Sequence, residues 1–204
     1  MELPGIVLAG GKSKRMGKNK ATLLWNNKTW IECVIHALVE SGCSPIIVSV
    51  NSQDDIIYLQ EYVNHYNVIW VIDEGKIAGM KGGLISSLRY ASKKGWDIVQ
   101  LAPCDTPQIT AEVFNMFSEI WSEKYDILVP NIKTDKNFDG FEPLLARVRV
   151  REYLSKLINF EYENDRIISP YSKLNVYLVT DCDFEKFKID KACISNYNLP
   201  QEIT

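Results

Sequence analysis

Residues 7–20 read VLAGGKSKRMGKNK, an apolar run followed at once by two adjacent glycines and a cluster of cations. The run from Gly5 to Ala9 has the composition of a strand that is buried on both faces of a parallel sheet. Adjacent glycines allow the backbone to approach a ligand closely and to turn its N–H groups toward an anion. The cations that follow are Lys12, Lys14, Arg15, Lys18 and Lys20. The stretch therefore predicts a strand that ends in a polyphosphate-binding loop.

Two common phosphate-binding sequences do not fit this loop. A Walker loop requires G-x-x-x-x-G-K-[ST]. Here the spacing from Gly11 to Gly17 is one residue too long, and Asn19 stands where Ser or Thr would hold magnesium. The dinucleotide fingerprint G-x-G-x-x-G is also absent. A solvated basic turn is the simpler alternative, because charge runs are usually surface features. The position directly after Gly-Gly at a strand end favours a ligand loop of another kind.

Further short apolar runs follow along the chain, at residues 45–50, 68–72, 97–102 and 125–130. Between these runs, apolar residues recur at helical spacing in 30–39, 84–91 and 113–121. Strands that alternate with helices predict a Rossmann-like, doubly wound α/β fold with a mostly parallel sheet. Ligands of such sheets bind beyond the carboxyl ends of the strands, which is where the glycine-rich loop would lie.

The alternation changes after about Pro130. Residues 133–140 are polar and end in glycine, which indicates a turn, so the flanking runs 127–132 and 141–148 are expected to pair as neighbours and to make the sheet mixed. A helix is expected over 149–158, irregular structure over 159–173 and a last strand over 175–180. The 204 residues fit one domain, with a nucleotide-binding half at 1–130 and an acceptor-binding half at 131–204.

Composition narrows the function classes. The net charge of −3 argues against a general nucleic-acid binder, which would need a basic surface. No apolar run reaches membrane-spanning length, and the N-terminus lacks the pattern of a signal peptide. The five cysteines are odd in number and show no C-x-x-C spacing, which is typical of free thiols in a reducing compartment. We therefore expect a cytoplasmic protein without nucleic-acid or membrane partners.

A second candidate site residue is Asp105, in the segment LAPCDTP at residues 101–107. It ends the predicted strand over 97–102, so its carboxylate is expected at the same sheet edge as the glycine-rich loop. Magnesium is commonly held by one or two carboxylates together with phosphate oxygens and water. The alternative is that Asp105 merely caps a turn. Cys104 is interpreted as a small buried residue, because His36 and His65 are the only histidines and neither lies near a motif.

The stretch L-A-G-G-x-S-x-R-M-G, which begins at Leu8 and is followed shortly by a lysine, resembles the signature of the molybdenum cofactor guanylyltransferase family. The resemblance implies a nucleotide-diphospho-sugar-transferase-like three-layer sandwich. It also implies that Leu8, Ala9, Gly10 and Gly11 lie against the nucleotide, that Arg15 contacts the phosphates, and that Lys20 stabilises charge at the reacting phosphorus. The segment Pro103-Cys104-Asp105 is similar to the family's P-C-D-x-P and implies that Asp105 is the Mg²⁺ ligand.

Residues after two further predicted strands are similar to nucleoside-binding positions of the family, namely Asn51 and Asp73 or Glu74. The loop from Gly79 to Gly83 is similar to a third such position. Of the two acids, Asp73 is the better match to the family, because its spacing to the next glycines fits the family better. The loop resembles G-P-L-x-G, with Met80 in place of proline. From the residues alone, Asn51 and Asp73 are equally typical of ordinary turns at strand ends.

Two later segments extend the resemblance. Glu142-Pro143-Leu144-Leu145-Ala146 is similar to [HEQ]-P-L-x-A, and the stretch from Asn196 to Glu202 is similar to N-x-N-T-P-x-[ED], with Leu199 in place of threonine. The resemblance places Asn196 and Asn198 on the acceptor or metal side of the site. Taken alone, they are two turn asparagines beside a proline.

The activity that the resemblance implies is transfer of GMP from GTP to molybdopterin, with Lys20, Arg15 and Asp105 as catalytic residues. GTP and molybdopterin would be the substrates, and other molybdenum cofactor biosynthesis proteins or a recipient molybdoenzyme would be candidate partners. A cytidylyl- or uridylyltransferase that acts on molybdopterin or on a sugar or polyol phosphate is the close alternative. A non-catalytic nucleotide-binding protein is a further alternative, which the complete set of cations and carboxylate disfavours.

Overall fold

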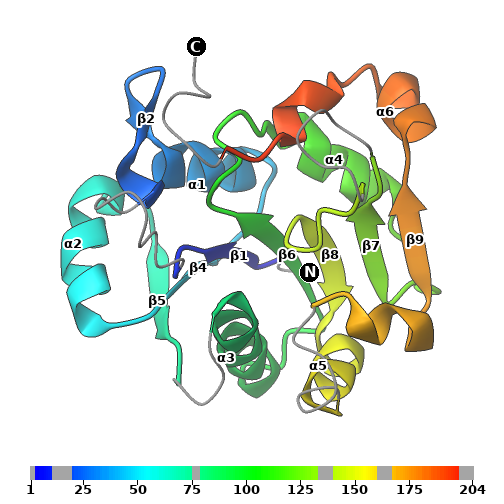
Figure 1. Cartoon of the computed structure of the whole chain (residues 1–204), viewed down its shortest axis with the longest axis horizontal. Helices are drawn as coiled ribbons and strands as arrows, with labels where there is room; N and C mark the ends of the chain where they lie inside the picture. Colours follow the sequence, from blue (N-terminus) through cyan, green and yellow to red (C-terminus); the bar gives the residue numbers. More distant parts are fainter. Residues whose placement is uncertain (1–2, 11–19, 75–78, 133–139, 160–166, 198–204) are drawn as a thin grey trace.

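The computed structural model describes residues 3–10, 20–74, 79–132, 140–159 and 167–197 and shows a seven-stranded sheet with helices on both faces (Figure 1). The strands of this sheet are β1 (Gly5–Leu8), β4 (Ile46–Val50), β5 (Val68–Ile72), β6 (Ile98–Pro103), β7 (Ile127–Pro130), β8 (Ala146–Arg149) and β9 (Val176–Val179). The helices are α1 (Trp30–Glu40), α2 (Gln53–Val63), α3 (Met80–Lys93), α4 (Ala111–Ile120), α5 (Val150–Asn159) and α6 (Asp181–Phe187). Three 3-10 turns are η1 (Lys20–Thr22), η2 (Ser169–Lys173) and η3 (Lys191–Ile194).

The strand order is β5-β4-β1-β6-β8-β7-β9. Strand β1 lies between β4 and β6 and is parallel to both, and β4 is parallel to β5. Strand β8 is antiparallel to β6 and β7, with Ile127 opposite Val148, whereas β7 and β9 are parallel. The doubly wound, mostly parallel but mixed α/β fold is therefore confirmed, and so is the expected pairing on either side of the polar turn.

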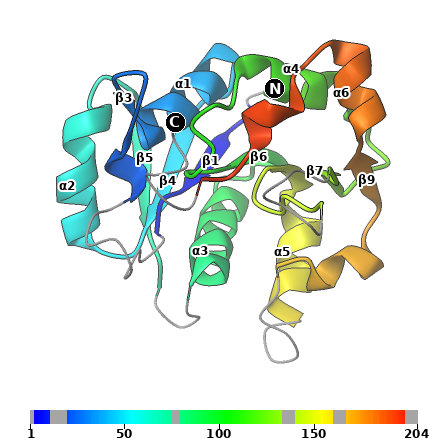
Figure 2. The ribbon, with the colours of Figure 1, turned by 45° about the horizontal axis from the view of Figure 1, so that its top comes forward.

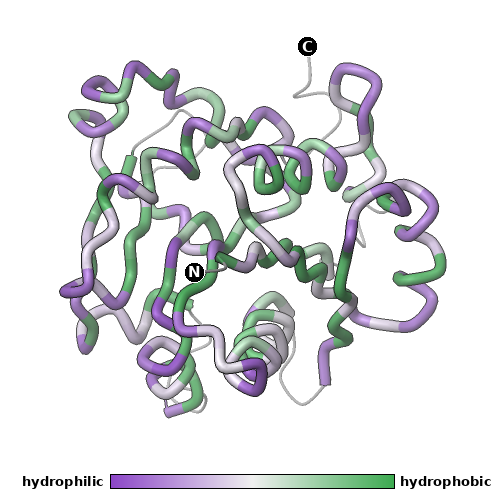
Figure 3. Tube along the Cα trace, turned by 180° about the vertical axis from the view of Figure 1, so that it is seen from behind, coloured by the Kyte–Doolittle hydropathy of each residue, from purple (hydrophilic) through white to green (hydrophobic). Residues whose placement is uncertain are grey.

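Alternation along the strands builds a core on each face of the sheet. Val7 joins the cluster under α1, α2, α4 and α6, whereas its neighbour Ile6 joins the cluster under α3 and α5. Successive side chains of a strand point to opposite faces, so an all-apolar strand supplies both cores. Figure 2 shows the resulting three layers, with α3 and α5 below the sheet and α1 and α4 above it. In Figure 3 the hydrophobic residues follow the central strands, and hydrophilic residues gather on the outer faces of the helices.

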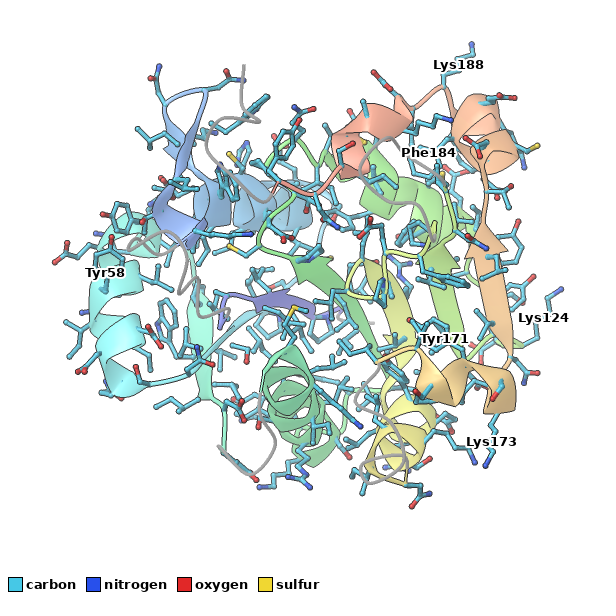
Figure 4. The ribbon with its side chains drawn as sticks, in the orientation of Figure 1. Tyr58, Lys124, Tyr171, Lys173, Phe184 and Lys188 are labelled. Carbon is cyan, nitrogen blue, oxygen red and sulfur yellow. The ribbon has the colours of Figure 1, made fainter. Side chains whose placement is uncertain are left out.

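Helix α6 illustrates how the helices are fixed on the sheet. Its single fully buried side chain, Phe184, turns inward, whereas Lys188 after its last turn points away from the protein (Figure 4). The helix begins at a capping box in which Thr180 and Asp183 satisfy each other's backbone N–H groups. It ends because Lys188 adopts the left-handed conformation, with a φ of 57°.

Some local structure differs from the expectations. The strand expected over 141–148 begins only at Ala146, because Pro143 has no backbone N–H and the Leu145 N–H donates to the Glu142 carbonyl in a turn. Within the region that was expected to be irregular, residues 169–173 form η2, and 160–166 lie outside the described residues. The sequence reading also missed the two-stranded hairpin of β2 (Leu24–Trp25) and β3 (Lys28–Thr29), which turns at Asn26 and Asn27 with φ values of 47° and 65°.

No helix in the described ranges combines the length and apolar character that a membrane crossing requires.

Candidate active site

The first part of the site lies where β1 and β4 end side by side. The Asn51 side chain after β4 donates from Nδ2 to the Gly10 carbonyl at 2.5 Å. A β carbon at Gly10 would lie 2.8 Å from Asn51 Oδ1, so a larger residue does not fit there without a shift. The Asn51 N–H in turn donates to Asp55 of α2 at 3.2 Å. The structure thus brings Gly10 and Asn51 together and holds the backbone at the start of the glycine-rich loop.

The first turn of α3 packs closely on the same two strands. Ser49 of β4 donates from Oγ to the Gly83 carbonyl at 3.3 Å. A β carbon at Gly83 would lie 2.8 Å from Ser49 Oγ and 3.9 Å from Leu8 Cδ2. Gly79, which precedes the helix, has a φ of 79°, a conformation that favours glycine. The first turn of α3, which contains Gly83, therefore lies against Leu8 and Ser49, and the predicted contacts of Leu8, Asn51, Gly79 and Gly83 with a nucleotide stay predictions.

Gly83→Ala is expected to destabilise the wild-type protein but to stabilise a Ser49→Ala variant. Overpacking costs about 1–3 kcal/mol, whereas alanine in place of a helical glycine gains about 1 kcal/mol. Removing the Ser49 hydroxyl removes the contact at 2.8 Å and leaves only the helical gain. Urea unfolding of both single variants and of the double variant measures the two effects. Equal effects of Gly83→Ala in both backgrounds would contradict this contact as the reason for glycine.

Asp73 and Glu74, which follow β5, have different surroundings. Glu74 forms an ion pair with Arg89 of α3 at 3.0 Å between Oε2 and Nη1. The Asp73 N–H donates to the Val50 carbonyl at 2.8 Å, and Ser86 Oγ donates to Asp73 Oδ1 at 3.5 Å. The Asp73 backbone is therefore tied to the end of β4, next to Asn51, while the Glu74 side chain is occupied by an arginine of the helix. This arrangement favours Asp73 as the nucleoside contact.

We expect Asp73→Asn to weaken nucleoside triphosphate binding by about 10- to 100-fold, the value of a hydrogen bond to a charged group. Glu74→Gln is the matched control and is expected to change binding by less than about 3-fold, because its surface ion pair contributes little. Titration calorimetry with a triphosphate measures both. If Glu74→Gln has the larger effect, the assignment of the two acids must be exchanged.

The second part of the site joins Lys20, in η1, to Asp105, in the turn after β6. Lys20 Nζ donates to the Tyr197 carbonyl at 3.5 Å, and the Tyr197 N–H donates to the Asp105 carbonyl at 2.9 Å. Both charged residues are half-buried. In Figure 1 the coloured segment that follows η3 runs back beside the loop after β6. Tyr197, the last of the described residues, therefore links Lys20 to Asp105, which are 85 positions apart in the sequence.

The charge state of Asp105 reflects these surroundings. Burial raises the pKa of its carboxyl above the ordinary value of 3.8, and the nearby Lys20 ammonium opposes this rise. Cys104 is 9% exposed, and burial followed by the Asp105 charge raises the pKa of its thiol. A thiol that resists ionisation is a poor nucleophile, so the interpretation of Cys104 as a small buried residue is confirmed.

The third part of the site joins Asn196, which follows η3, to Glu142, in the turn before β8. Asn196, next to Tyr197, donates from Nδ2 to Glu142 Oε2 at 2.6 Å. Its other side-chain atom, Oδ1, is buried and has no hydrogen-bond partner among the described residues. Such an oxygen is suited to a ligand that the chain itself does not contain. Asn196 thus precedes the residue that binds the Asp105 backbone, and its predicted place on the acceptor or metal side stays a prediction.

Sequence reasoning missed the residue that organises the site. Tyr197 is 7% exposed, and its ring lies 5.8 Å from that of Trp25 and 6.2 Å from that of Trp30, measured between centroids. Gln108 donates from Nε2 to the Tyr197 hydroxyl. The sequence signal that could have identified Tyr197 is its position between two asparagines, Asn196 and Asn198. Gly11, Arg15 and Asn198 lie outside the described residues, so their predicted roles stay predictions.

A sequence profile of the MobA-like NTP transferase domain matches residues 5–174. The probable molybdenum cofactor guanylyltransferase of Bacillus cereus is 33% identical over 159 residues, which are 77% of this chain and 74% of that protein. The molybdenum cofactor guanylyltransferase of Vibrio vulnificus is 30% identical over 202 residues, which are 98% of this chain and 92% of that protein.

Solved structures share the fold. Molybdopterin-guanine dinucleotide biosynthesis protein A from Archaeoglobus fulgidus superimposes with a TM-score of 0.74 at 23% identity, covering 98% of this chain and 95% of the other. The 4-diphosphocytidyl-2C-methyl-D-erythritol synthase from Anaerococcus prevotii superimposes with a TM-score of 0.72 at 12% identity, covering 99% and 92%. These likenesses confirm the expected nucleotide-diphospho-sugar-transferase-like fold.

Proposed function

The chain belongs to the family of MobA-like NTP transferase domains, and from this membership we propose that it transfers GMP from GTP to the phosphate of molybdopterin. The products would be molybdopterin guanine dinucleotide and pyrophosphate. The names of the relatives that match at 30% and 33% identity support the guanylyl group and the acceptor. GTP and molybdopterin are thus the proposed substrates, and a recipient molybdoenzyme or other cofactor biosynthesis proteins are the proposed partners.

The reaction needs positioning and charge neutralisation more than it needs a base. An oxygen of the acceptor phosphate attacks the α-phosphorus, a bond from that phosphorus to oxygen forms, and the bond to the pyrophosphate leaving group breaks. A phosphomonoester has its second pKa near about 6 and is already largely a dianion at neutral pH. A chain with only two histidines can therefore perform this transfer. The barrier is repulsion between two polyanions, which cations and orientation lower.

We assign these tasks to the residues of the candidate site. The Gly10 backbone, held by Asn51, would orient the triphosphate, and Lys20 would neutralise charge that develops at the α-phosphorus. Arg15 would contact the phosphates, as the resemblance implies. The observation that carries the proposal is the chain of contacts through Tyr197, because it links the Lys20 cation to Asp105 at the end of β6. A cation and a carboxylate suffice for this transfer, because the acceptor phosphate is itself the nucleophile.

Magnesium is the proposed cofactor, with Asp105 as its protein ligand. The surroundings fit a hard cation. The Asp105 carboxylate is half-buried, and Tyr197 binds the Asp105 backbone. Asn196, which precedes Tyr197, has a buried side-chain oxygen that finds no hydrogen-bond partner within the described ranges. When bound, Mg²⁺ would neutralise phosphate oxygens and favour departure of pyrophosphate. Asp105 would hold and orient this charge.

Pyrophosphate release tests the proposal directly. The purified protein is incubated with Mg²⁺, molybdopterin and each of the four ribonucleoside triphosphates in turn, and we expect release with GTP that depends on molybdopterin. Release with CTP or UTP alone would replace the guanylyl assignment by the cytidylyl or uridylyl alternative. Release with none of the four, while a triphosphate still binds, would favour a non-catalytic nucleotide-binding protein.

A further inference from the structure

The orientation of the Asn196 side-chain amide is fixed by its partner. Asn196 Nδ2 lies 2.6 Å from Glu142 Oε2, and Glu142 is only 6% exposed. A carboxylate accepts hydrogen bonds and donates none. If the amide were rotated by half a turn, its carbonyl oxygen would face the carboxylate oxygen, and two acceptors would repel each other. The nitrogen therefore faces Glu142, and the oxygen faces away from it.

This orientation decides what Asn196 can bind. Its amide nitrogen donates to Glu142, and its Oδ1 is buried without a hydrogen-bond partner in the part of the chain that the structure describes. A buried polar atom left without a partner costs free energy, so its retention points to a ligand. An acceptor oxygen does not hydrogen-bond to the oxygens of a phosphate dianion, which need donors. It does bind a hard divalent cation, for which protein oxygens are the preferred ligands.

The backbone brings Asn196 to within one residue of a direct contact with Asp105. Tyr197, the next residue, donates its N–H to the Asp105 carbonyl at 2.9 Å. Glu142 belongs to the turn before β8, and β8 pairs with β6, the strand that ends just before Asp105. The Glu142 carboxylate thus holds the Asn196 side chain, and the Asp105 carbonyl holds the backbone of the next residue.

We propose that Glu142 is a positioning residue that fixes the Asn196 amide so that its carbonyl oxygen, and not its nitrogen, faces the divalent cation held by Asp105. Asn196 is then a cation ligand and not an anchor of the acceptor phosphate. This inference rests on the proposed function only in taking Asp105 as the cation site.

Cation binding separates this role from a merely structural one. Mn²⁺ replaces Mg²⁺ as a spectroscopic probe, and the electron paramagnetic resonance signal of free Mn²⁺ is followed in the presence of the α,β-methylene analogue of GTP, which cannot react. Glu142→Met is expected to weaken Mn²⁺ binding by about 10- to 100-fold, as is typical when the residue that orients a ligand is lost. Glu142→Gln retains an acceptor oxygen for the Asn196 nitrogen and is expected to stay within about 3-fold of wild type.

A double-mutant cycle tests whether Glu142 acts through Asn196. Asn196→Ala should weaken Mn²⁺ binding as well, and adding Glu142→Met should weaken it no further, because coupled residues are not additive. Glu185→Met, at an exposed position of α6, is the matched control and should leave binding unchanged. Additive losses in the double variant, wild-type binding by folded Glu142→Met, or no Mn²⁺ binding by the wild type would each overturn the proposal.

The outcome is separable from that of the proposed function. The same titration is run with the α,β-methylene analogues of CTP and UTP, and the comparison among variants uses whichever analogue the wild type binds. Failure of GTP in the pyrophosphate assay would thus leave this test intact, and failure of this test would leave the base and acceptor of the transfer reaction unaffected.

Discussion

Asp105→Asn is expected to lower the rate of nucleotidyl transfer by about 10³-fold, the effect of losing several kcal/mol of metal-assisted charge stabilisation. The amide has the shape of the carboxylate but carries no charge, so the half-buried site should fold as before. Triphosphate binding should be largely retained, because the Gly10–Asn51 contact does not involve Asp105. Single-turnover transfer and triphosphate affinity are measured on the same preparation.

The same substitution should stabilise the metal-free protein at neutral pH. Burial raises the pKa of Asp105 in the folded state above its ordinary value of 3.8, so the unfolded chain releases this proton first as the pH rises. The wild type therefore loses stability between pH 3.8 and the raised folded pKa, whereas Asp105→Asn does not. The difference in the free energy of unfolding should be close to zero below that window and positive above it. Urea unfolding at several pH values, with a chelator present, measures it.

The control for both measurements is Asp54→Asn, at an exposed position of the first turn of α2. It should leave transfer unchanged, and it should lower stability slightly, because a negative charge near a helix N-terminus is favourable. An Asp105→Asn variant with the wild-type rate would remove Asp105 from the mechanism. A metal-free variant that is less stable than the wild type at neutral pH would show that the carboxylate is stabilised and not penalised by its surroundings.

Lys20→Met is expected to lower the transfer rate by about 10²- to 10³-fold, as is typical when a preorganised charge partner is removed. Methionine keeps much of the apolar stem but neither the charge nor the donor. The substitution has a second consequence, because the Lys20 ammonium lowers the pKa of Asp105. Without it, Asp105 stays protonated to a higher pH. The acid limb of the remaining activity should therefore move to higher pH, which a pH–rate profile of the variant measures.

Lys28→Met is the matched control, because Lys28 is an exposed lysine of the nearby β2–β3 hairpin. It should leave both the rate and the acid limb where they are in the wild type. If Lys20→Met lowers the rate but leaves the acid limb unchanged, Lys20 acts on the phosphates without influencing Asp105. If it changes neither, Lys20 has no part in the transfer.

Local sequence determined much of the architecture. Runs such as Gly5 to Ala9 are apolar at every position because both faces of a parallel strand are buried, and this composition can be recognised without the fold. Gly42 and Gly95, which follow α1 and α3, have φ values of 85° and 76° that favour glycine, so these helix ends were also readable. Elements with few apolar residues could not be recognised in this way, as the missed hairpin at Asn26 and Asn27 illustrates.

Within the candidate site, the sequence by itself determined which residue types stand at the strand ends, namely Gly10 after β1 and Asp105 after β6, and the resemblance gave them roles. Only the tertiary structure decided how they meet. The contact of Lys20 with Tyr197, the orientation of Asn196 by Glu142 and the pKa of Asp105 all depend on burial and on partners far away in the chain. No local pattern encodes these properties, because hydrogen-bond geometry and desolvation arise only when distant segments pack together.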